Sequence, residues 1–354
     1  MLSFTYNALP GRIIFGVGAV SKLPEEVDRL GAKRLLIVVD GSKKALAEEL
    51  GQQLGDRFAG VFSHLTAHVP RETAQSVRQM AREASATCVV TVGGGSTTGL
   101  GKAIALESEI AIIAIPTTYA GSEMTPVYGL TSEGQKRVGR DLRVLPKVVI
   151  YDPALTTSLP ASVTGPSGMN AIAHCVEALY SKDANPITSL MAEEGIRALV
   201  QGLPRAVRNP EDLEGRTQAL YGAYLAGAAL AVTGMAIHHR ICHVLGGTYG
   251  LPHGDANAVI LPHAIKFNAN AAPEAIARVA RAAGVKDPAA GLFDFAVAIG
   301  APASLAGLGM QKSDLDEAAK LSVQPPLWNP RPVDFDAVRA LLADAYHGCR
   351  PTSA

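Results

Sequence analysis

The chain has 354 residues, of which 48% are hydrophobic and 18% are charged. This length exceeds what one hydrophobic core usually holds, so we expect two domains. Lys plus Arg and Asp plus Glu balance at 32 each, which excludes a general attraction to nucleic acid or anionic membranes and favours small-molecule partners. The four cysteines form no CxxC pair and the N-terminus has no basic-then-apolar signal region, which predicts a cytoplasmic protein with reduced thiols.

Residues 1–155 alternate apolar, β-branched runs with segments of helical spacing. The expected strands are Arg34–Val39, Thr87–Val92, Ile110–Ile115 and Lys147–Tyr151, and helices are expected at Lys43–Leu54 and Ala74–Ala84. Nearly continuous apolar strands that alternate with helices are typical of a parallel sheet covered on both faces. The first domain is therefore predicted to be α/β, with a doubly wound, Rossmann-like parallel sheet.

Residues 156–354 lack strand-like runs and are rich in Ala, Leu and Glu at helical spacing. Helices are expected at Met169–Tyr180, Thr188–Val200 and Phe335–Tyr346, which predicts an all-α second domain that begins near residues 152–160. The uncharged stretch Gln218–Ile237 is long enough to span a bilayer. Its many Ala, Gly and Tyr residues favour a buried core helix instead.

The stretch Thr91–Lys102, TVGGGSTTGLGK, predicts a turn between a strand ending at Val92 and a helix beginning near Thr98. Free main-chain N–H groups at such a helix start bind phosphate. The turn matches neither GxGxxG nor the P-loop pattern. A plain structural turn is the alternative interpretation.

Two other strand ends carry polar residues. Asp40 is followed by Gly41 and Ser42, and the strand ending at Ile115 is followed by Pro116, Thr117 and Thr118. Ligands of open α/β sheets bind at the carboxyl edge, where an acidic residue accepts hydrogen bonds from a ribose. The three loops together favour a dinucleotide over a mononucleotide.

The second domain contains two pairs of polar residues at helical spacing of four. Asn170 and His174 form one pair, His239 and His243 form the other, and His253 follows after a glycine-rich loop. Imidazoles one helical turn apart hold a metal ion or shuttle a proton. Periodicity directs His238 elsewhere; ordinary structural roles are expected for His64, His263 and His347, and His68 is left undecided.

In this order, the motifs resemble the iron-containing alcohol dehydrogenase superfamily, whose fold is shared with glycerol dehydrogenase and dehydroquinate synthase. The matching segments are IIFGVG, Asp40, GGGS, IPTT, GSE, Pro146–Pro153, the histidine region and NPR (Asn329–Arg331). The resemblance implies that any bound metal would be held by His174, His239 and His253. Asn170 stands where the family has an aspartate ligand, and an amide brings no charge to a cation.

Within that superfamily, GGGSTTGLGKAIAL, IPTTYAGSEMTPVYG and AIAHCVEALY resemble the maleylacetate reductase branch, and Gly99 replaces an acidic residue of the wider pattern. The branch implies NADH- or NADPH-dependent reduction of 2-maleylacetate to 3-oxoadipate in aromatic-compound degradation, without metal, by a homodimer. The implied cofactor-binding residues are Asp40, Gly41, Ser42, Gly94, Gly95, Ser96, Lys102, Thr117, Thr118 and Lys136.

Reduction of an enone requires a hydride donor, a stabiliser of the enolate oxygen and a proton source. We expect His239 and His253 to donate hydrogen bonds to the enolate or a carboxylate, and His243 to supply the proton. Asn170 and His174 would orient the substrate. The substrate carboxylates call for cations, for which Arg240 and Lys136 are candidates, although Lys136 would otherwise contact the nicotinamide ribose.

Two other functions stay open. One is a metal-dependent alcohol or polyol dehydrogenase of the same superfamily, and the other is a non-catalytic nucleotide-binding regulator. The choice between NADH and NADPH also stays open, because Asp40 repels a 2′-phosphate whereas the lysines that follow it attract one. The homodimer is expected to join sheets at an N-terminal edge strand such as Phe4–Ala8.

Overall fold

The computed structural model describes residues 4–9, 11–64, 69–132 and 135–352, and side chains within 131–137 lie outside the description. The chain divides into two compact units, Leu9–Thr157 and Ser158–Ala354, and the latter includes Met1–Ala8. The division falls where the sequence changes from alternating strands and helices to helices alone.

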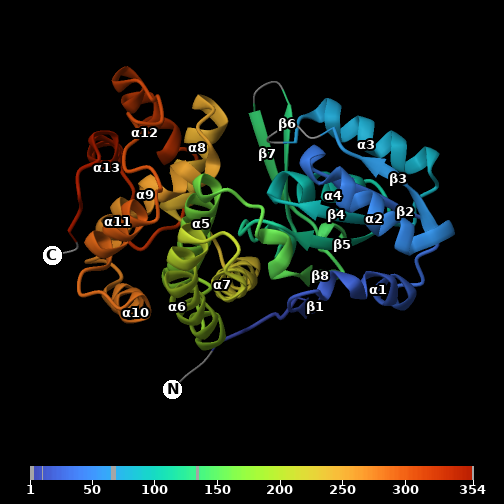
Figure 1. The fold of residues 1–354 in the computed structure, drawn as a ribbon. Helices are drawn as coiled ribbons and strands as arrows, with labels where there is room; N and C mark the ends of the chain where they lie inside the picture. The colour runs from blue at the N-terminus through green and yellow to red at the C-terminus, as the bar shows by residue number, and fades with distance from the viewer. Residues whose placement is uncertain (1–3, 10, 65–68, 133–134, 353–354) are drawn as a thin grey trace. The chain divides into compact units, whose positions relative to one another are not determined.

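The unit Leu9–Thr157 is built on a six-stranded parallel sheet with the order β1-β8-β5-β4-β2-β3 (Figure 1). The strands are β1 (Arg12–Phe15), β2 (Leu35–Val39), β3 (Phe58–Phe62), β4 (Cys88–Gly93), β5 (Ala111–Pro116) and β8 (Val148–Tyr151). All five pairings are parallel. The four predicted strands are confirmed as the interior strands, whose residues are almost all buried.

Alternate strand residues pack against helices on opposite faces of this sheet. Leu35, Ile37 and Val39 of β2 share a buried cluster with α1 (Leu23–Arg29) and α2 (Lys44–Leu54). Leu36 and Val38 share another with α3 (Arg71–Glu83) and α4 (Gly95–Leu106). Because helices cover both faces of the sheet, the residues on both sides of each interior strand are shielded from water. These strands are therefore continuous apolar runs in the sequence. The doubly wound sheet is confirmed.

Four strands of the structure were not predicted from the sequence. β1 and β3 are the sheet's edges and are less buried than the interior strands. β6 (Val127–Ser132) and β7 (Gln135–Arg140) form a separate antiparallel pair. These segments lack the continuous apolar pattern of a strand that has neighbours on both sides and both faces covered.

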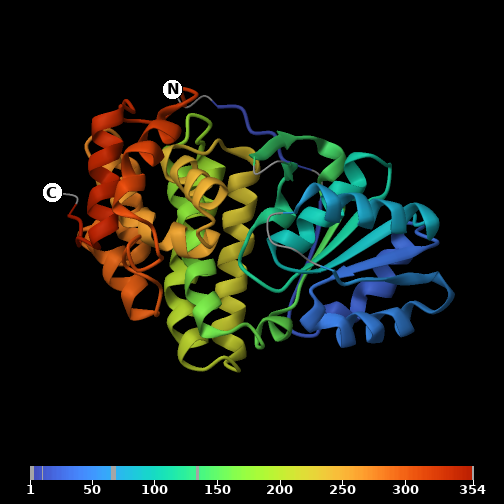
Figure 2. The same cartoon turned by 90° about the horizontal axis from the view of Figure 1, so that it is seen from above.

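The unit that begins at Ser158 is helical, as predicted. Its three long helices, α5 (Ala161–Tyr180), α6 (Pro186–Arg208) and α7 (Leu213–Val232), lie side by side and are coloured green to yellow in Figure 2. The remaining helices are α8 (Ile237–Tyr249), α9 (His253–Asn268), α10 (Pro273–Ala283), α11 (Pro288–Ala298), α12 (Leu315–Val323) and α13 (Phe335–His347). Parts of α8, α9, α12 and α13 enclose one continuous hydrophobic cluster.

The uncharged stretch forms a core helix over most of its length. α7 begins at Leu213 and ends at Val232, and eleven of its residues are buried. Among the described residues, no single helix is long and apolar enough to cross a membrane. Within the same described ranges, one pair of helices, α7 and α8, is long and apolar enough when taken together, and the two are bent by 100° relative to each other.

The strand expected at Phe4–Ala8 is not formed within the single chain. These residues have no strand pairing in the structure, and Phe4 is 46% exposed. The edge of the sheet is β1, which begins at Arg12. A segment of this kind gains strand structure only by pairing with another strand, so the homodimer stays a prediction.

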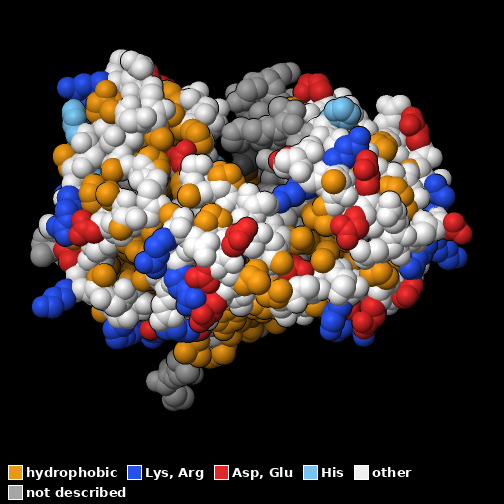
Figure 3. All heavy atoms as spheres, viewed as in Figure 1, with side chains coloured by type: hydrophobic (Ala, Val, Ile, Leu, Met, Phe, Trp, Pro, Cys, Tyr) orange, Lys and Arg blue, Asp and Glu red, His pale blue; other side chains and the backbone are white. Residues whose placement is uncertain are grey.

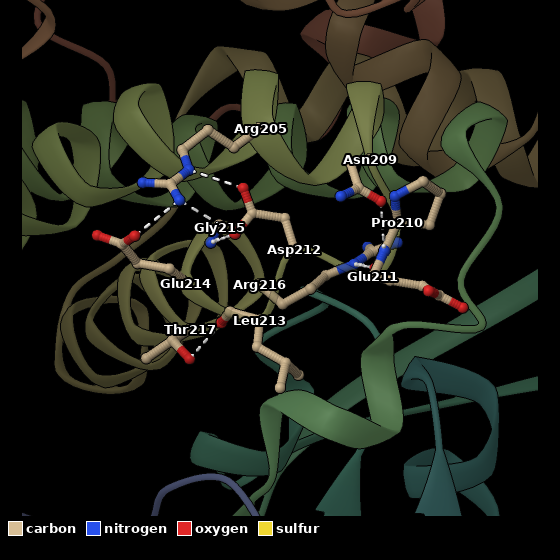
Figure 4. A network of polar contacts seen from close by, with 10 residues as sticks. All are labelled: Arg205, Asn209, Pro210, Glu211, Asp212, Leu213, Glu214, Gly215, Arg216 and Thr217. Carbon is tan, nitrogen blue, oxygen red and sulfur yellow. Dashed lines mark hydrogen bonds and ion pairs between the residues drawn. The ribbon is translucent and has the colours of Figure 1, made fainter.

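Two arginines hold the connection between α6 and α7 (Figure 4). Arg205 makes ion pairs with Asp212 and Glu214 at 2.8 and 2.7 Å, and its side chain is 40% exposed. Arg216 is fully buried and donates hydrogen bonds to the Pro210 and Leu159 carbonyl oxygens and to Thr164 Oγ1. The buried guanidinium of Arg216 is therefore paired with two main-chain carbonyl oxygens and with the buried Thr164 hydroxyl.

The surface carries charges of both signs in mixture. On the face drawn in Figure 3, Lys and Arg side chains alternate with Asp and Glu over both units. Several form exposed pairs, such as Arg350 with Asp294 at 2.7 Å and Lys266 with Asp344 at 3.1 Å. This distribution agrees with the absence of net charge in the sequence.

The burial of the two arginines predicts unequal effects on stability. Arg216→Met should lower the free energy of unfolding by on the order of 3 kcal/mol, because it removes a fully buried group that holds Pro210, Leu159 and Thr164 together. The control Arg205→Met should have a clearly smaller effect, since exposed ion pairs contribute little. Urea denaturation followed by circular dichroism measures both, and equal midpoints for the two variants would contradict the assignment.

Candidate functional site

Three predicted loops lie at one edge of the parallel sheet. β5, β4 and β2 are neighbours in the sheet, and Val39 pairs with Val92, which pairs with Ile115. Their carboxyl ends therefore bring Asp40 and the glycine turn to the same edge. The chain runs from β2 outward to β3 and then returns to β4 on the other side of β2. This reversal is a topological switch point, where such sheets bind ligands.

The glycine turn is tighter than predicted. β4 continues to Gly93, and α4 begins at Gly95 rather than near Thr98. Gly93 has φ of +155°, and a Cβ there would lie 2.4 Å from Thr97 Oγ1. A Cβ on Gly94 would lie 3.0 Å from Thr118 Cγ2. Glycine is required at both positions because the turn packs against the two threonines. Helical spacing in the sequence does not reveal these contacts.

The first turn of α4 is joined to the loop after β5. Thr117 N donates a hydrogen bond to the Gly93 carbonyl oxygen at 3.0 Å. Gly94 is the N-cap residue, no side chain caps the helix there, and the first turn contains no acidic residue. Helix starts of this kind attract anions through their N–H groups and the helix dipole. Gly94, Gly95 and Ser96 are thus suited to a diphosphate.

Asp40 lies at the end of β2 with an exposed side chain. Its Oδ1 accepts a hydrogen bond from Ser42 N at 2.9 Å, which caps the short 3₁₀ turn Gly41–Lys43. Desolvation lowers the pKa of the neighbouring Lys43, and the charge of Asp40 partly opposes this shift. The carboxylate is therefore presented at the switch point with a lysine beside it.

Lys102 requires a correction. It was predicted to contact the cofactor, but it is fully buried. Its Nζ donates to the carbonyl oxygens of Ser122, Thr125 and Val127 at 2.7, 2.8 and 2.6 Å. Burial lowers its pKa to about 7, an effect that Glu123 partly opposes. An ammonium group has three donors, so Lys102 ties α4 to the loop before β6 and leaves none for a phosphate.

Replacement of Lys102 tests this role. Lys102→Met should lower the free energy of unfolding by roughly 2 to 3 kcal/mol, because buried carbonyl oxygens lose their donor. The salt dependence of NADH binding should stay unchanged, since no phosphate contact is lost. Thermal denaturation and fluorescence titration with NADH measure the two effects, with the exposed Lys320→Met as control. A weaker salt dependence would restore the phosphate contact.

The two predicted substrate cations have different outcomes. Arg240 lies in α8, between the two predicted catalytic histidines of that helix, and its Nη1 donates to the Gln324 carbonyl oxygen at 3.2 Å. Lys136 lies in β7, within the stretch whose side chains lie outside the described residues. Arg240 therefore remains a candidate, and Lys136 stays a prediction.

Four imidazoles from three helices form a continuous chain, as the spacing predicted. His174 of α5 stacks on His239 of α8, with ring centroids 4.7 Å apart and ring planes inclined by 10°. The ring centroids of His239 and His243 are 6.3 Å apart, and those of His243 and His253 are 6.0 Å apart. His253, which follows the glycine-rich loop, is the first residue of α9. The sequence-predicted set is thus brought together within the helical unit.

The two ends of this chain differ in burial. His174 and His239 are 4% and 1% exposed, whereas His243 and His253 are partly exposed. Burial lowers the pKa of His174 well below its usual value and that of His239 to about 3, and neighbouring imidazoles add to both shifts. Both rings are therefore neutral near pH 7.

Three buried polar atoms of this cluster have no hydrogen-bond partner among the described residues. They are Asn170 Oδ1, His174 Nδ1 and His239 Nε2. An unpaired polar atom in a protein interior is costly. These atoms are therefore ligand-binding candidates, and Asn170 and His174 share a face of α5 as the sequence predicted.

The other histidines behave largely as expected. His238 Nε2 is 2.7 Å from Asn257 Oδ1, although its ring also meets that of His239 edge-on, with centroids 4.8 Å apart. His64 and His347 contact the neighbouring rings of Phe62 and Tyr346. His263 is buried on α9 and both ring nitrogens lack a partner among the described residues. His68 lies outside the described residues.

Sequence reasoning missed Glu177. This residue lies three positions after His174 in α5, is 1% exposed, and its Oε2 is 2.7 Å from His239 Nδ1. The available signal was the spacing of Asn170, His174 and Glu177, which places an acidic residue on the same apolar helix face. A buried acidic side chain almost always has a partner, so this spacing predicts a paired carboxylate beside the histidines.

The cluster lacks the aspartate ligand of the family pattern, because Asn170 stands at that position. Within the described ranges, no group of three or more His, Cys, Asp or Glu side chains has a geometry that would hold one. The nearest carboxylate, Glu177, is directed at His239 Nδ1 and at main-chain N–H groups. The other polar groups are neutral: imidazole is a common metal ligand, whereas the Asn170 amide brings no charge to offset the desolvation of a cation.

A sheet edge suited to a dinucleotide and a cluster of imidazoles are features expected of a nicotinamide-dependent oxidoreductase. Residues 10–153 match the family described as iron-containing alcohol dehydrogenase, and residues 164–346 match the C-terminal part of the Fe-containing alcohol dehydrogenase family. The chain belongs to the iron-containing alcohol dehydrogenase family. This membership favours an enzyme over the non-catalytic regulator.

Several relatives match over nearly the whole chain. A maleylacetate reductase from Burkholderia cepacia is 51% identical over 99% of this chain and 100% of its own length. The crystal structure of maleylacetate reductase from Agrobacterium tumefaciens has a TM-score of 0.95 at 48% identity, with 99% of this chain and 100% of that chain covered. A sulfoacetaldehyde reductase from Bifidobacterium kashiwanohense, solved in complex with NAD⁺, has a TM-score of 0.90 at 25% identity, with 98% and 99% covered.

Proposed function

We propose that this enzyme reduces the carbon–carbon double bond of 2-maleylacetate to give 3-oxoadipate, with NADH or NADPH as hydride donor. The observation that carries the proposal is the neutral set of polar side chains Asn170, His174 and His239, in which Asn170 replaces the family's aspartate ligand. Similarity over the full length to maleylacetate reductases supports it. Such a reaction belongs to the breakdown of aromatic rings.

The cofactor role is assigned to the unit Leu9–Thr157. The N–H groups at Gly94, Gly95 and Ser96 are suited to the pyrophosphate, since the start of α4 has no side-chain cap. The Asp40 carboxylate, exposed at the end of β2, is suited to the ribose hydroxyls. Thr117 and Thr118 follow β5, next to the glycine turn.

The chemistry at the substrate follows from charge. Hydride adds to the alkene carbon β to the ketone, the electron pair moves to the ketone oxygen, and the α carbon of the resulting enolate takes a proton. Stabilisation of that oxygen requires donors or positive charge, and Arg240 and His253 are the candidates. His243 is the proposed proton source, because a partly exposed imidazole regains its proton from water.

The proposal does not require a metal. The enolate of an enone is already delocalised, so hydrogen-bond donors suffice where a simple ketone more often needs a Lewis acid. The unpaired atoms Asn170 Oδ1, His174 Nδ1 and His239 Nε2 are the observation in favour of the alternative, a metal-dependent alcohol dehydrogenase. In the metal-free proposal, these three atoms form hydrogen bonds with substrate or water instead.

An assay decides between the two functions. The purified enzyme should oxidise NADH or NADPH with maleylacetate and form one 3-oxoadipate per nicotinamide, before and after EDTA treatment. Absorbance at the nicotinamide band and chromatography of the product measure this. Activity that is lost with EDTA and regained with Fe²⁺ or Zn²⁺ would favour the metal-dependent enzyme, and no oxidation with maleylacetate would overturn the proposal.

Replacement of the partly exposed histidines tests their roles. His243→Ala and His253→Ala should each lower kcat by about 10²- to 10⁴-fold, the usual range for loss of an acid–base group or an oxyanion donor. His347→Ala on α13 is the matched control, because its exposed ring contacts only Tyr346 in the described contacts. Wild-type turnover in both variants would refute the assignment.

A further inference from the structure

Glu177 makes contacts that join two helices of the histidine cluster. Its carboxylate, from α5, accepts hydrogen bonds from Ala236 N at 3.0 Å and His238 N at 2.9 Å. These amides belong to the start of α8, where no side chain of the N-cap residue Ala236 caps the helix. Asn329 Oδ1 accepts from the intervening amide, Ile237 N, at 3.4 Å. Glu177 is therefore an N-terminal cap supplied from another helix.

The third contact of Glu177 is with a member of the imidazole chain. Oε2 is 2.7 Å from His239 Nδ1, and the two side chains are 1% and 2% exposed. Burial raises the pKa of Glu177, and the nearby His238 and the hydrogen bonds from α8 oppose that shift. Main-chain N–H groups only donate, so two of them on this carboxyl group favour its acceptor form. An acceptor at this position requires the proton to reside on His239 Nδ1.

The opposite nitrogen of His239 then has a lone pair. Nε2 is buried and has no hydrogen-bond partner among the described residues, and the stacked ring of His174 fixes the plane of the imidazole. A neutral imidazole that donates through Nδ1 accepts through Nε2. This geometry conflicts with the expectation that His239 donates to an enolate or a carboxylate, since both of these are acceptors.

We infer that Glu177 is a positioning residue that fixes His239 in the Nδ1–H tautomer, so that Nε2 accepts a hydrogen bond from a donor such as a water molecule. The anionic oxygens of the substrate then fall to Arg240 and His253 rather than to His239. This inference rests on the proposed function for its catalytic consequence. The tautomer itself depends only on the contacts of Glu177.

Glu177→Gln tests the inference because it reverses one hydrogen bond. The glutamine amide group donates to His239 Nδ1 while its oxygen still accepts from one amide of α8, so Nε2 gains the proton. In protein labelled with ¹⁵N-histidine, the two nitrogen signals of His239, assigned with His239→Gln, should exchange between protonated and unprotonated shifts. Loss of the orienting acid at a histidine commonly costs several orders of magnitude in turnover, and kcat should fall at least 10²-fold while the Kd for NADH stays within twofold.

Glu193→Gln is the matched control. Glu193 is a helix carboxylate paired with Arg278 at 2.8 Å in the same helical unit, so this variant should leave both the spectrum of His239 and kcat unchanged. A wild-type protein with the proton on His239 Nε2, or an unchanged tautomer in folded Glu177→Gln, would overturn the inference. If Glu177→Gln does not fold, the wild-type spectrum decides alone.

The test separates the inference from the proposed function. An Nδ1–H tautomer in wild-type enzyme that does not reduce maleylacetate supports the role of Glu177 and refutes the proposed substrate. An Nε2–H tautomer in enzyme that reduces maleylacetate supports the function and refutes the role of Glu177.

Discussion

Every buried main-chain N–H and carbonyl group needs a partner, and both candidate sites depend on how this requirement is met. At α8, the carboxylate of Glu177 takes the amides of Ala236 and His238. At α4, no side chain caps the first turn after Gly94, so its amides are suited to an anion. Lys102 supplies donors to the carbonyl groups before β6. Where a helix end has no protein group to pair its main-chain amides, as at the start of α4, a ligand is suited to take that place.

The same requirement changes how the imidazole chain works. Because Glu177 serves α8 as a cap, it is not available as an anionic metal ligand, and it determines the tautomer of His239. Burial keeps His174 and His239 neutral, whereas His243 and His253 reach solvent. The row of imidazoles therefore has a buried end suited to orienting the substrate and a partly exposed end suited to proton transfer. A reduction that passes through an enolate is compatible with that division.

The sequence predicts the interior strands of the sheet and the helix faces that carry the histidines. Interior strands such as Arg34–Val39 were found because burial on both faces leaves a continuous apolar run, and Asn170, His174, His239 and His243 were paired because helical period fixes their faces. The edge strands β1 and β3 and the hairpin β6–β7 were missed because partial burial removes that pattern. Lys102 was misassigned because a glycine-rich turn followed by lysine resembles a phosphate site whether or not the lysine points to it.

The sequence by itself determined the family, the doubly wound sheet, the helical second unit and the helix faces that carry the histidines, since these depend on local period and on motif order. Only the tertiary structure decided what each side chain donates to or accepts from. Glu177 reaches His239 across 62 positions in the chain, and Lys102 reaches Val127 across 25. Hydrogen-bond direction depends on partners that folding brings together, and no local pattern encodes it.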